Sequence, residues 1–66
     1  MDPTECLAQI FEDLFEGETE AAVNGMSNLD KWLKDGGFQP HVAKAMQTFY
    51  DRNEPTITRL IEGEYE

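Results

Sequence analysis

The apolar residues near the start of the chain recur at intervals of three and four, which is the spacing of one face of an α-helix. They are Leu7, Ile10, Phe11, Leu14 and Phe15. Ahead of them, Asp2 and Pro3 are typical of an N-cap and of the first helical position, and Glu5 completes a capping box. Because Gly17 is a stop signal, this pattern predicts a helix over residues 3–16.

A second apolar stripe follows after a short interruption. Thr19 is a favourable cap, and the residues behind it that share one helical face are Ala22, Gly25, Met26, Leu29, Trp32 and Leu33. Gly25 lies on the apolar side, where a missing side chain lets another helix come close. The pair Gly36 and Gly37 is a C-terminal signal, and Phe38 is placed to fold back against the helix end. The pattern predicts a helix over residues 19–35.

The third stripe begins after Pro40, a residue favoured at the first helical position. Its members are Val42, Met46, Phe49 and Tyr50. Pro55 interrupts it, yet the apolar residues beyond the proline keep the same helical phase, which favours a continued helix over a loop. We therefore expect a helix over residues 40–62 with a kink or break near Pro55. A strand over residues 56–61 is the alternative, because Thr56, Ile57 and Thr58 have strand propensity.

Short turns between these segments favour neighbouring antiparallel helices. The sequence thus predicts an all-α fold, a small up-down-up three-helix bundle that forms a single domain over residues 1–66, with a frayed tail at 62–66. A chain of 66 residues buries only about 60% of its unfolded surface. A deep enzymatic pocket is therefore not expected.

Charge divides the chain at Lys31. The whole sequence has a formal net charge of -9, and no Lys or Arg precedes Lys31, whereas acids and bases nearly balance after it. Because binding to nucleic acid or to an anionic membrane depends on Lys and Arg, direct binding of either through a basic face is not expected. No apolar run approaches the ~18 residues of a membrane span, and the lone Cys6 favours a reducing, cytoplasmic setting.

The acids of the first predicted helix gather on the side opposite its apolar stripe, with no basic residue at helical spacing. The simplest interpretation is a solvated face that keeps a small protein soluble. The functional interpretation is a docking surface for a partner protein with a basic surface, helped by aromatics that a small core cannot bury completely. The predicted partner-binding residues are Glu5, Glu12, Asp13, Glu16, Glu20, Trp32 and Phe38.

These features predict a non-enzymatic protein–protein interaction module: a small acidic adaptor, regulator or inhibitor. A homodimer is compatible with this prediction, because a second copy would enlarge a marginal core. The alternative is a nucleic-acid mimic, whose carboxylates occupy the basic cleft of a nucleic-acid-binding enzyme.

Other chemistry has weaker support in the sequence. Cys6 and His41 are the only candidates for a nucleophile and its base, and an enzyme would need both in one pocket. Asp51, Asn53 and Glu62 match three positions of a calcium-binding loop, but Pro55 stands where that loop needs a side-chain oxygen. No catalytic, cofactor-binding or metal-binding residues are predicted.

Overall fold

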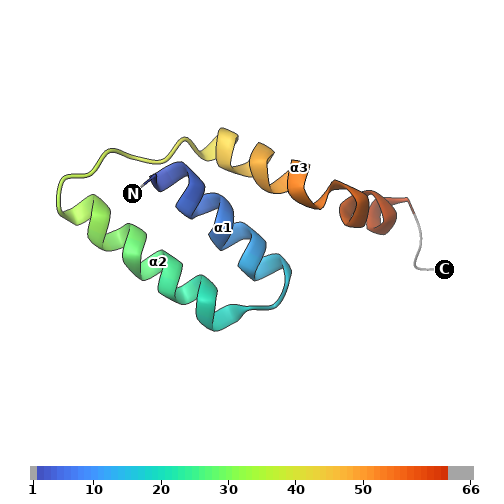
Figure 1. Cartoon of the computed structure of the whole chain (residues 1–66), viewed down its shortest axis with the longest axis horizontal. Coiled ribbons are helices and arrows are strands. Elements are labelled where there is room, and N and C mark those ends of the chain that lie inside the picture. The colour runs from blue at the N-terminus through green and yellow to red at the C-terminus, as the bar shows by residue number, and fades with distance from the viewer. Residues whose placement is uncertain (1, 63–66) are drawn as a thin grey trace.

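The computed structural model describes residues 2–62 and contains three helices: α1 (Pro3–Phe15), α2 (Thr19–Lys34) and α3 (Val42–Ile61). Figure 1 shows α1 between the other two, with α2 antiparallel to it and α3 running in the same direction as α1. The predicted all-α three-helix fold is confirmed, and residues 2–62 contain no strand.

The ends of α1 and α2 follow the glycine signals in the sequence. Gly17 and Gly36 adopt left-handed backbone conformations, with φ of 78° and 93°, which glycine accommodates without strain. At the end of α1, the amide of Gly17 donates to the Leu14 carbonyl and the amide of Glu18 to the Asp13 carbonyl. The same two bonds recur around Gly36, so both helices end in a Schellman motif.

The third helix begins later than predicted. Its N-cap is His41, whose Nδ1 accepts a hydrogen bond from the Lys44 amide at 3.1 Å. Pro40 is therefore not the first helical residue, because the imidazole of His41 supplies the capping acceptor one residue further along. At the other end, α3 continues through Pro55 without interruption, and its ribbon bends beyond the middle (Figure 1). The strand alternative for residues 56–61 is wrong.

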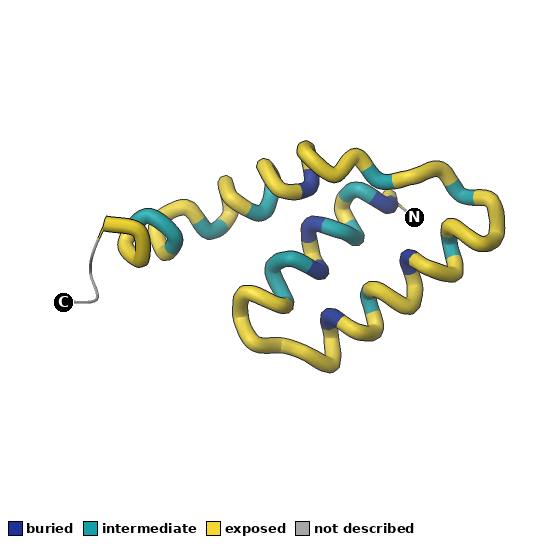
Figure 2. Tube along the Cα trace, turned by 180° about the vertical axis from the view of Figure 1, so that it is seen from behind, coloured by how far each residue is buried: buried dark blue, intermediate teal, exposed yellow. Residues whose placement is uncertain are grey.

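Small side chains let α1 and α2 pack closely. Ile10, Ala22 and Leu29 are buried between them, and the Cys6 Sγ donates to the Gly25 carbonyl at 3.7 Å. A Cβ atom at Gly25 would lie 2.8 Å from the Ile10 Cγ1, closer than van der Waals contact permits. The prediction that Gly25 permits a close helix approach is confirmed. Figure 2 shows the buried positions of α2 on its side toward α1, and buried positions of α1 on both its sides, toward α2 and toward α3.

Aromatic rings join α1 to α3. Phe49 of α3 packs edge-to-face against Phe11 and Phe15, with ring centroids 6.3 Å and 5.4 Å apart, a favoured aromatic geometry. Near the start of α3, the amide of His41 donates to the Thr4 Oγ1 at 2.9 Å. This contact fixes the beginning of α3 against the first turn of α1.

The three helices form one layer. Within the part of the chain that the structure describes, α1 contacts both neighbours, whereas α2 and α3 do not contact each other. The molecule measures 47 × 23 × 12 Å, and 12 Å is the diameter of a single helix with its side chains. The buried apolar core is correspondingly small and consists of Ala8, Ile10, Ala22, Leu29 and Ala45.

Two predictions concern the chain beyond this core. Of the predicted frayed tail at 62–66, only Glu62 lies within the described residues, where it follows the last turn of α3. Among residues 2–62, no helix combines the length and the apolar character needed to cross a membrane.

Candidate functional site

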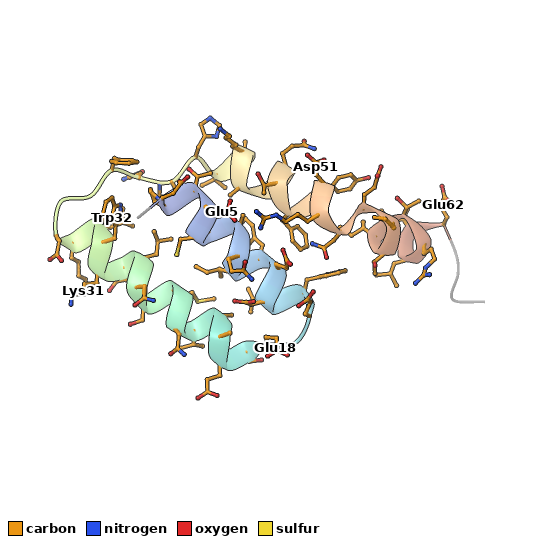
Figure 3. The ribbon with its side chains drawn as sticks, viewed as in Figure 1. Glu5, Glu18, Lys31, Trp32, Asp51 and Glu62 are labelled. Atoms are coloured by element: carbon orange, nitrogen blue, oxygen red, sulfur yellow. The ribbon has the colours of Figure 1, made fainter. Side chains whose placement is uncertain are left out.

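The predicted partner-binding residues fall into three separate groups. Two of the acids lie beside α3, a second set surrounds the turn between α1 and α2, and the two aromatics lie at the far end of α2. Figure 3 shows this separation, because Glu18 and Trp32 occupy opposite ends of α2. The acids and the aromatics therefore do not make one continuous surface.

Glu5 and Glu12 belong to an ion-pair network that links α1 to α3. The Arg52 Nη2 lies 2.6 Å from the Glu5 Oε2, and its Nη1 lies 3.7 Å from the Glu12 Oε1. The hydrogen bond and charge of Glu5, followed by the charge of Glu12, raise the pKa of the Arg52 guanidinium. The sequence pattern places no basic residue beside these acids within α1, and the cationic partner comes instead from α3, which carries Arg52 alongside α1.

Four carboxylates lie around the turn between α1 and α2, of which Asp13 is half-buried and the other three are exposed. Asp13 accepts a hydrogen bond from the Gln9 Nε2 at 3.0 Å, and Glu16, Glu18 and Glu20 are exposed. Within residues 2–62, no Lys, Arg or His forms a salt bridge with any of them. We call Asp13, Glu16, Glu18 and Glu20 the acidic turn. Glu18 is the member that the sequence prediction did not include, since it lies outside both predicted helices.

Apolar side chains border the acidic turn. Leu14 and Phe15, in the last turn of α1, keep 49% and 39% of their surface exposed. The amphipathic stripe in the sequence indicated that both would be buried. Within residues 2–62, the neighbouring helices therefore leave this end of α1 partly uncovered.

Trp32 and Phe38 close the turn at the other end of α2. The Trp32 Nε1 donates to the Phe38 carbonyl at 3.0 Å, and the two rings pack edge-to-face with centroids 5.7 Å apart. A Cβ atom at Gly37 would collide with the indole ring. Phe38 folds back as predicted, yet its side chain remains 69% exposed. This pair therefore has a structural role whether or not a partner touches it.

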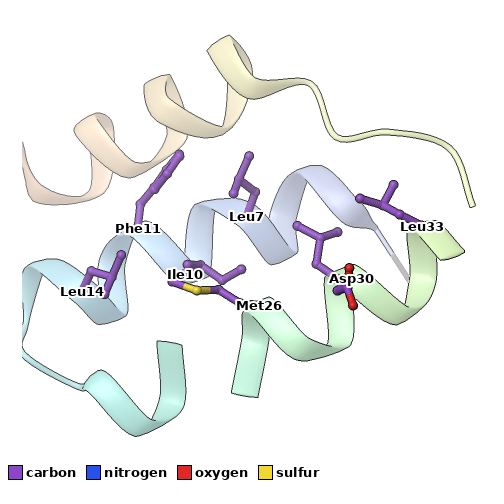
Figure 4. A pocket seen from close by; sticks show the side chains of 8 residues that line it. Leu7, Ile10, Phe11, Leu14, Met26, Asp30 and Leu33 are labelled. Carbon is purple, nitrogen blue, oxygen red and sulfur yellow. The ribbon is translucent and has the colours of Figure 1, made fainter. Parts of the chain in front are cut away.

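An apolar groove runs between α1 and α2 on one face of the layer. It has a volume of about 340 Å³, and Figure 4 shows how its lining side chains project from the two helices. Asp30 is the only charged residue that lines it, and its Oδ2 lies 2.9 Å from the Lys34 Nζ. The lining residues are Leu7, Ile10, Phe11, Leu14, Met26, Leu29, Asp30 and Leu33.

The structure does not bring Cys6 and His41 together. The Cys6 thiol points to α2, where burial raises its pKa, and His41 caps α3 against Thr4 on the other side of α1. Asp51 and Asn53 lie within the continuous helix α3, which cannot wrap around a calcium ion as a loop does. Among the residues described, no three His, Cys, Asp or Glu side chains are grouped to hold a metal ion.

No protein-family model matches this chain, and neither a curated protein nor a solved structure does so. The function is therefore inferred from the surfaces of this molecule alone.

Proposed function

We propose that this chain is a non-enzymatic protein–protein interaction module, an adaptor, regulator or inhibitor, that docks a basic surface of a partner protein onto the acidic turn. The observation that carries the proposal is the local concentration of exposed carboxylates without a cationic partner among residues 2–62. Such a field attracts and orients a positively charged protein as it approaches.

The surroundings of the acidic turn favour docking over a purely solubilising role. Exposed apolar area from Leu14 and Phe15 adjoins the carboxylates. Protein interfaces commonly combine an apolar centre with a polar rim, and a solvated face needs only the charges. A basic partner with an apolar side chain at its centre has the complementary chemistry.

The remaining predicted residues have a smaller part in this proposal. Glu5 and Glu12 are engaged by Arg52, and Trp32 with Phe38 lies at the opposite end of α2. The half-buried Cys6 thiol is consistent with a reducing cytoplasm. The proposed docking site is therefore the acidic turn with Leu14 and Phe15.

The test is a matched pair of charge reversals. The triple variant Glu16→Lys, Glu18→Lys, Glu20→Lys reverses the acidic turn, and the control variant Asp35→Lys, Glu54→Lys, Glu62→Lys changes net charge equally at exposed sites elsewhere. Each tagged protein is used to capture proteins from a lysate of the source cells, and captured proteins are then titrated in purified form.

We expect the wild type and the control to bind the same purified partner with similar affinity. The turn variant should bind this partner at least tenfold more weakly, and binding by the wild type should weaken at least tenfold at increased salt. Circular dichroism checks that all three proteins are folded. Equal affinity of the turn variant and the control would contradict the proposal. If duplex DNA competes with this chain for the basic surface of the partner, that result would support the nucleic-acid-mimic alternative.

A further inference from the structure

Apolar side chains from all three helices, exposed or half-buried, lie on one face of the layer. On α1 and α2 they form the groove of Figure 4. On α3, Val42, Met46 and Tyr50 are also exposed, Met46 by 56%. We call this surface the apolar face; its members are Leu7, Phe11, Leu14, Met26, Leu33, Val42, Met46 and Tyr50.

The position of the α3 stripe follows from helical geometry. Successive residues are rotated by about 100°, so Met46 lies roughly a quarter turn away from Ala45 and Phe49, which face α1. On α1, Leu7 and Leu14 lie between the side toward α2 and the side toward α3. Because α1 and α3 run in the same direction, these rotations direct both stripes to the same face of the layer.

The opposite face of the layer carries the charges. On α1 the same rotation places Glu5, Glu12, Asp13 and Glu16 away from Leu7 and Leu14. The one charge in the groove, Asp30, already has Lys34 as its partner. Covering the apolar face would therefore not bury an unpaired carboxylate, which is the main cost of closing a polar surface.

The thickness and area of the chain indicate what covers this face. Helical domains are built from at least two packed layers, and this chain has one. A compact folded chain of 7.5 kDa exposes about 4,200 Å², roughly 600 Å² less than the 4820 Å² of this chain. A standard protein interface buries about 800 Å² on each partner, so the excess is about three quarters of one partner's share.

We propose that the apolar face binds a second copy of this chain, giving a two-fold symmetric dimer in which two layers enclose a shared core. A two-fold axis pairs the same patch on both copies, so each apolar face supplies the area that the other lacks. The charged faces point outward. The carboxylates of the acidic turn and Phe15 stay on the surface of the dimer, whereas Leu14, which borders both sites, becomes part of the shared core.

Salt separates this proposal from docking at the acidic turn. Each copy carries a formal net charge of -9, so two copies repel each other at long range, and screening weakens that repulsion. Dimerisation therefore strengthens with increasing salt. Binding of a basic partner to the acidic turn weakens over the same range, so either proposal can fail without the other.

The first experiment is sedimentation equilibrium of the full chain from 1 to 200 µM, at low and high salt. We expect the mass to rise with concentration to a plateau of about 15 kDa, twice the chain mass of 7.5 kDa. In high salt, the mass should reach this plateau at a lower concentration. Thermal melting by circular dichroism should shift upward with concentration, as for any folded dimer. A constant mass of one chain at 200 µM in high salt would overturn the proposal, as would growth beyond two copies without a plateau.

The second experiment compares two substitutions on α2. Met26→Glu adds a charge to the apolar face, where Met26 is 43% exposed, and Asn28→Glu adds the same charge at an exposed position facing away from it. We expect Met26→Glu to weaken dimerisation at least about tenfold and Asn28→Glu to leave it within about twofold. Equal effects of the two substitutions would contradict the assignment to this face. If Met26→Glu unfolds, the concentration dependence of wild-type melting still decides between dimer and monomer.

Discussion

The molecule has two helix–helix contacts, which we call the α1–α2 seam and the α1–α3 seam, and they are built in different ways. Between α1 and α2, Gly25 and small side chains let the backbones approach, and the contact is continuous and buried. Between α1 and α3, Ala45 is buried, but most of the contact comes from the Phe49 ring and the Arg52 guanidinium, both of which remain partly exposed. The first seam depends on the absence of a side chain, and the second depends on the presence of long ones.

This difference indicates how each seam should respond to mutation. Added volume has no space at Gly25 in the α1–α2 seam, because Ile10 already fills the position beside it and close-packed contacts do not tolerate extra atoms. Removed volume is the main threat to the α1–α3 seam, since few side chains make that contact. Because α2 and α3 do not contact each other within residues 2–62, α3 can separate while α1 and α2 stay paired.

The largest effect is expected at Gly25. Gly25→Leu places a full side chain where even a Cβ would lie 2.8 Å from the Ile10 Cγ1. We expect a loss of about 3 kcal/mol in the free energy of unfolding, which removes most of the stability of a domain this small. Urea titration followed by circular dichroism measures it.

The matched control is Asn24→Leu, one residue earlier on α2 at an exposed position. It adds the same side chain without a neighbour to displace, so its effect should stay within about 0.5 kcal/mol. Equal free energies of unfolding for Gly25→Leu and Asn24→Leu would contradict the close approach of α1 and α2 at Gly25.

The sequence predicts helices better than it predicts their contacts. Helix boundaries depend on local signals such as Gly17 and Gly36, and these predictions agree with the structure within one residue for α1 and α2. The start of α3 was misplaced because a histidine can act as the capping residue while Pro40 stays outside the helix. That capping bond involves the Nδ1 of a residue type that is uncommon at this position.

The candidate site was harder to predict for a different reason. Glu5 and Glu12 are seven residues apart and therefore lie on one helix face, but this spacing does not indicate that they share a cationic partner. Their partner, Arg52, is distant in sequence, and only the packing of α3 beside α1 brings it near. Burial was overestimated for Leu14 and Phe15, because an apolar stripe does not reveal whether a neighbouring helix covers it.

An intermediate effect is expected at Phe49. Phe49→Ala removes both edge-to-face pairs between α1 and α3, so we expect a loss of about 2 kcal/mol, below that of a fully buried phenylalanine. Phe49→Leu, which keeps apolar volume without a ring, should lose less than half as much.

Two probes distinguish loss of α3 from global unfolding. Circular dichroism reports all three helices, whereas Trp32 fluorescence reports the end of α2, where the indole packs against Phe38 and the core. In Phe49→Ala the dichroism transition should begin at lower urea than the fluorescence transition. Coincident transitions in this variant would show that the two seams unfold as one unit.

The smallest effect concerns Cys6 in the α1–α2 seam and depends on pH. Burial raises the pKa of its thiol above the ordinary value, so the folded protein binds the proton more tightly than the unfolded chain does. The contribution is fully present below the unfolded pKa, near 8.5, and is lost as pH rises through the folded pKa. The melting temperature of the wild type should therefore fall more between pH 8 and pH 10 than that of Cys6→Ala, which has no thiol to ionise. The difference between the two proteins isolates the contribution of Cys6 from that of every other group in the chain. Parallel declines would show that burial in the α1–α2 seam does not change the pKa of the thiol.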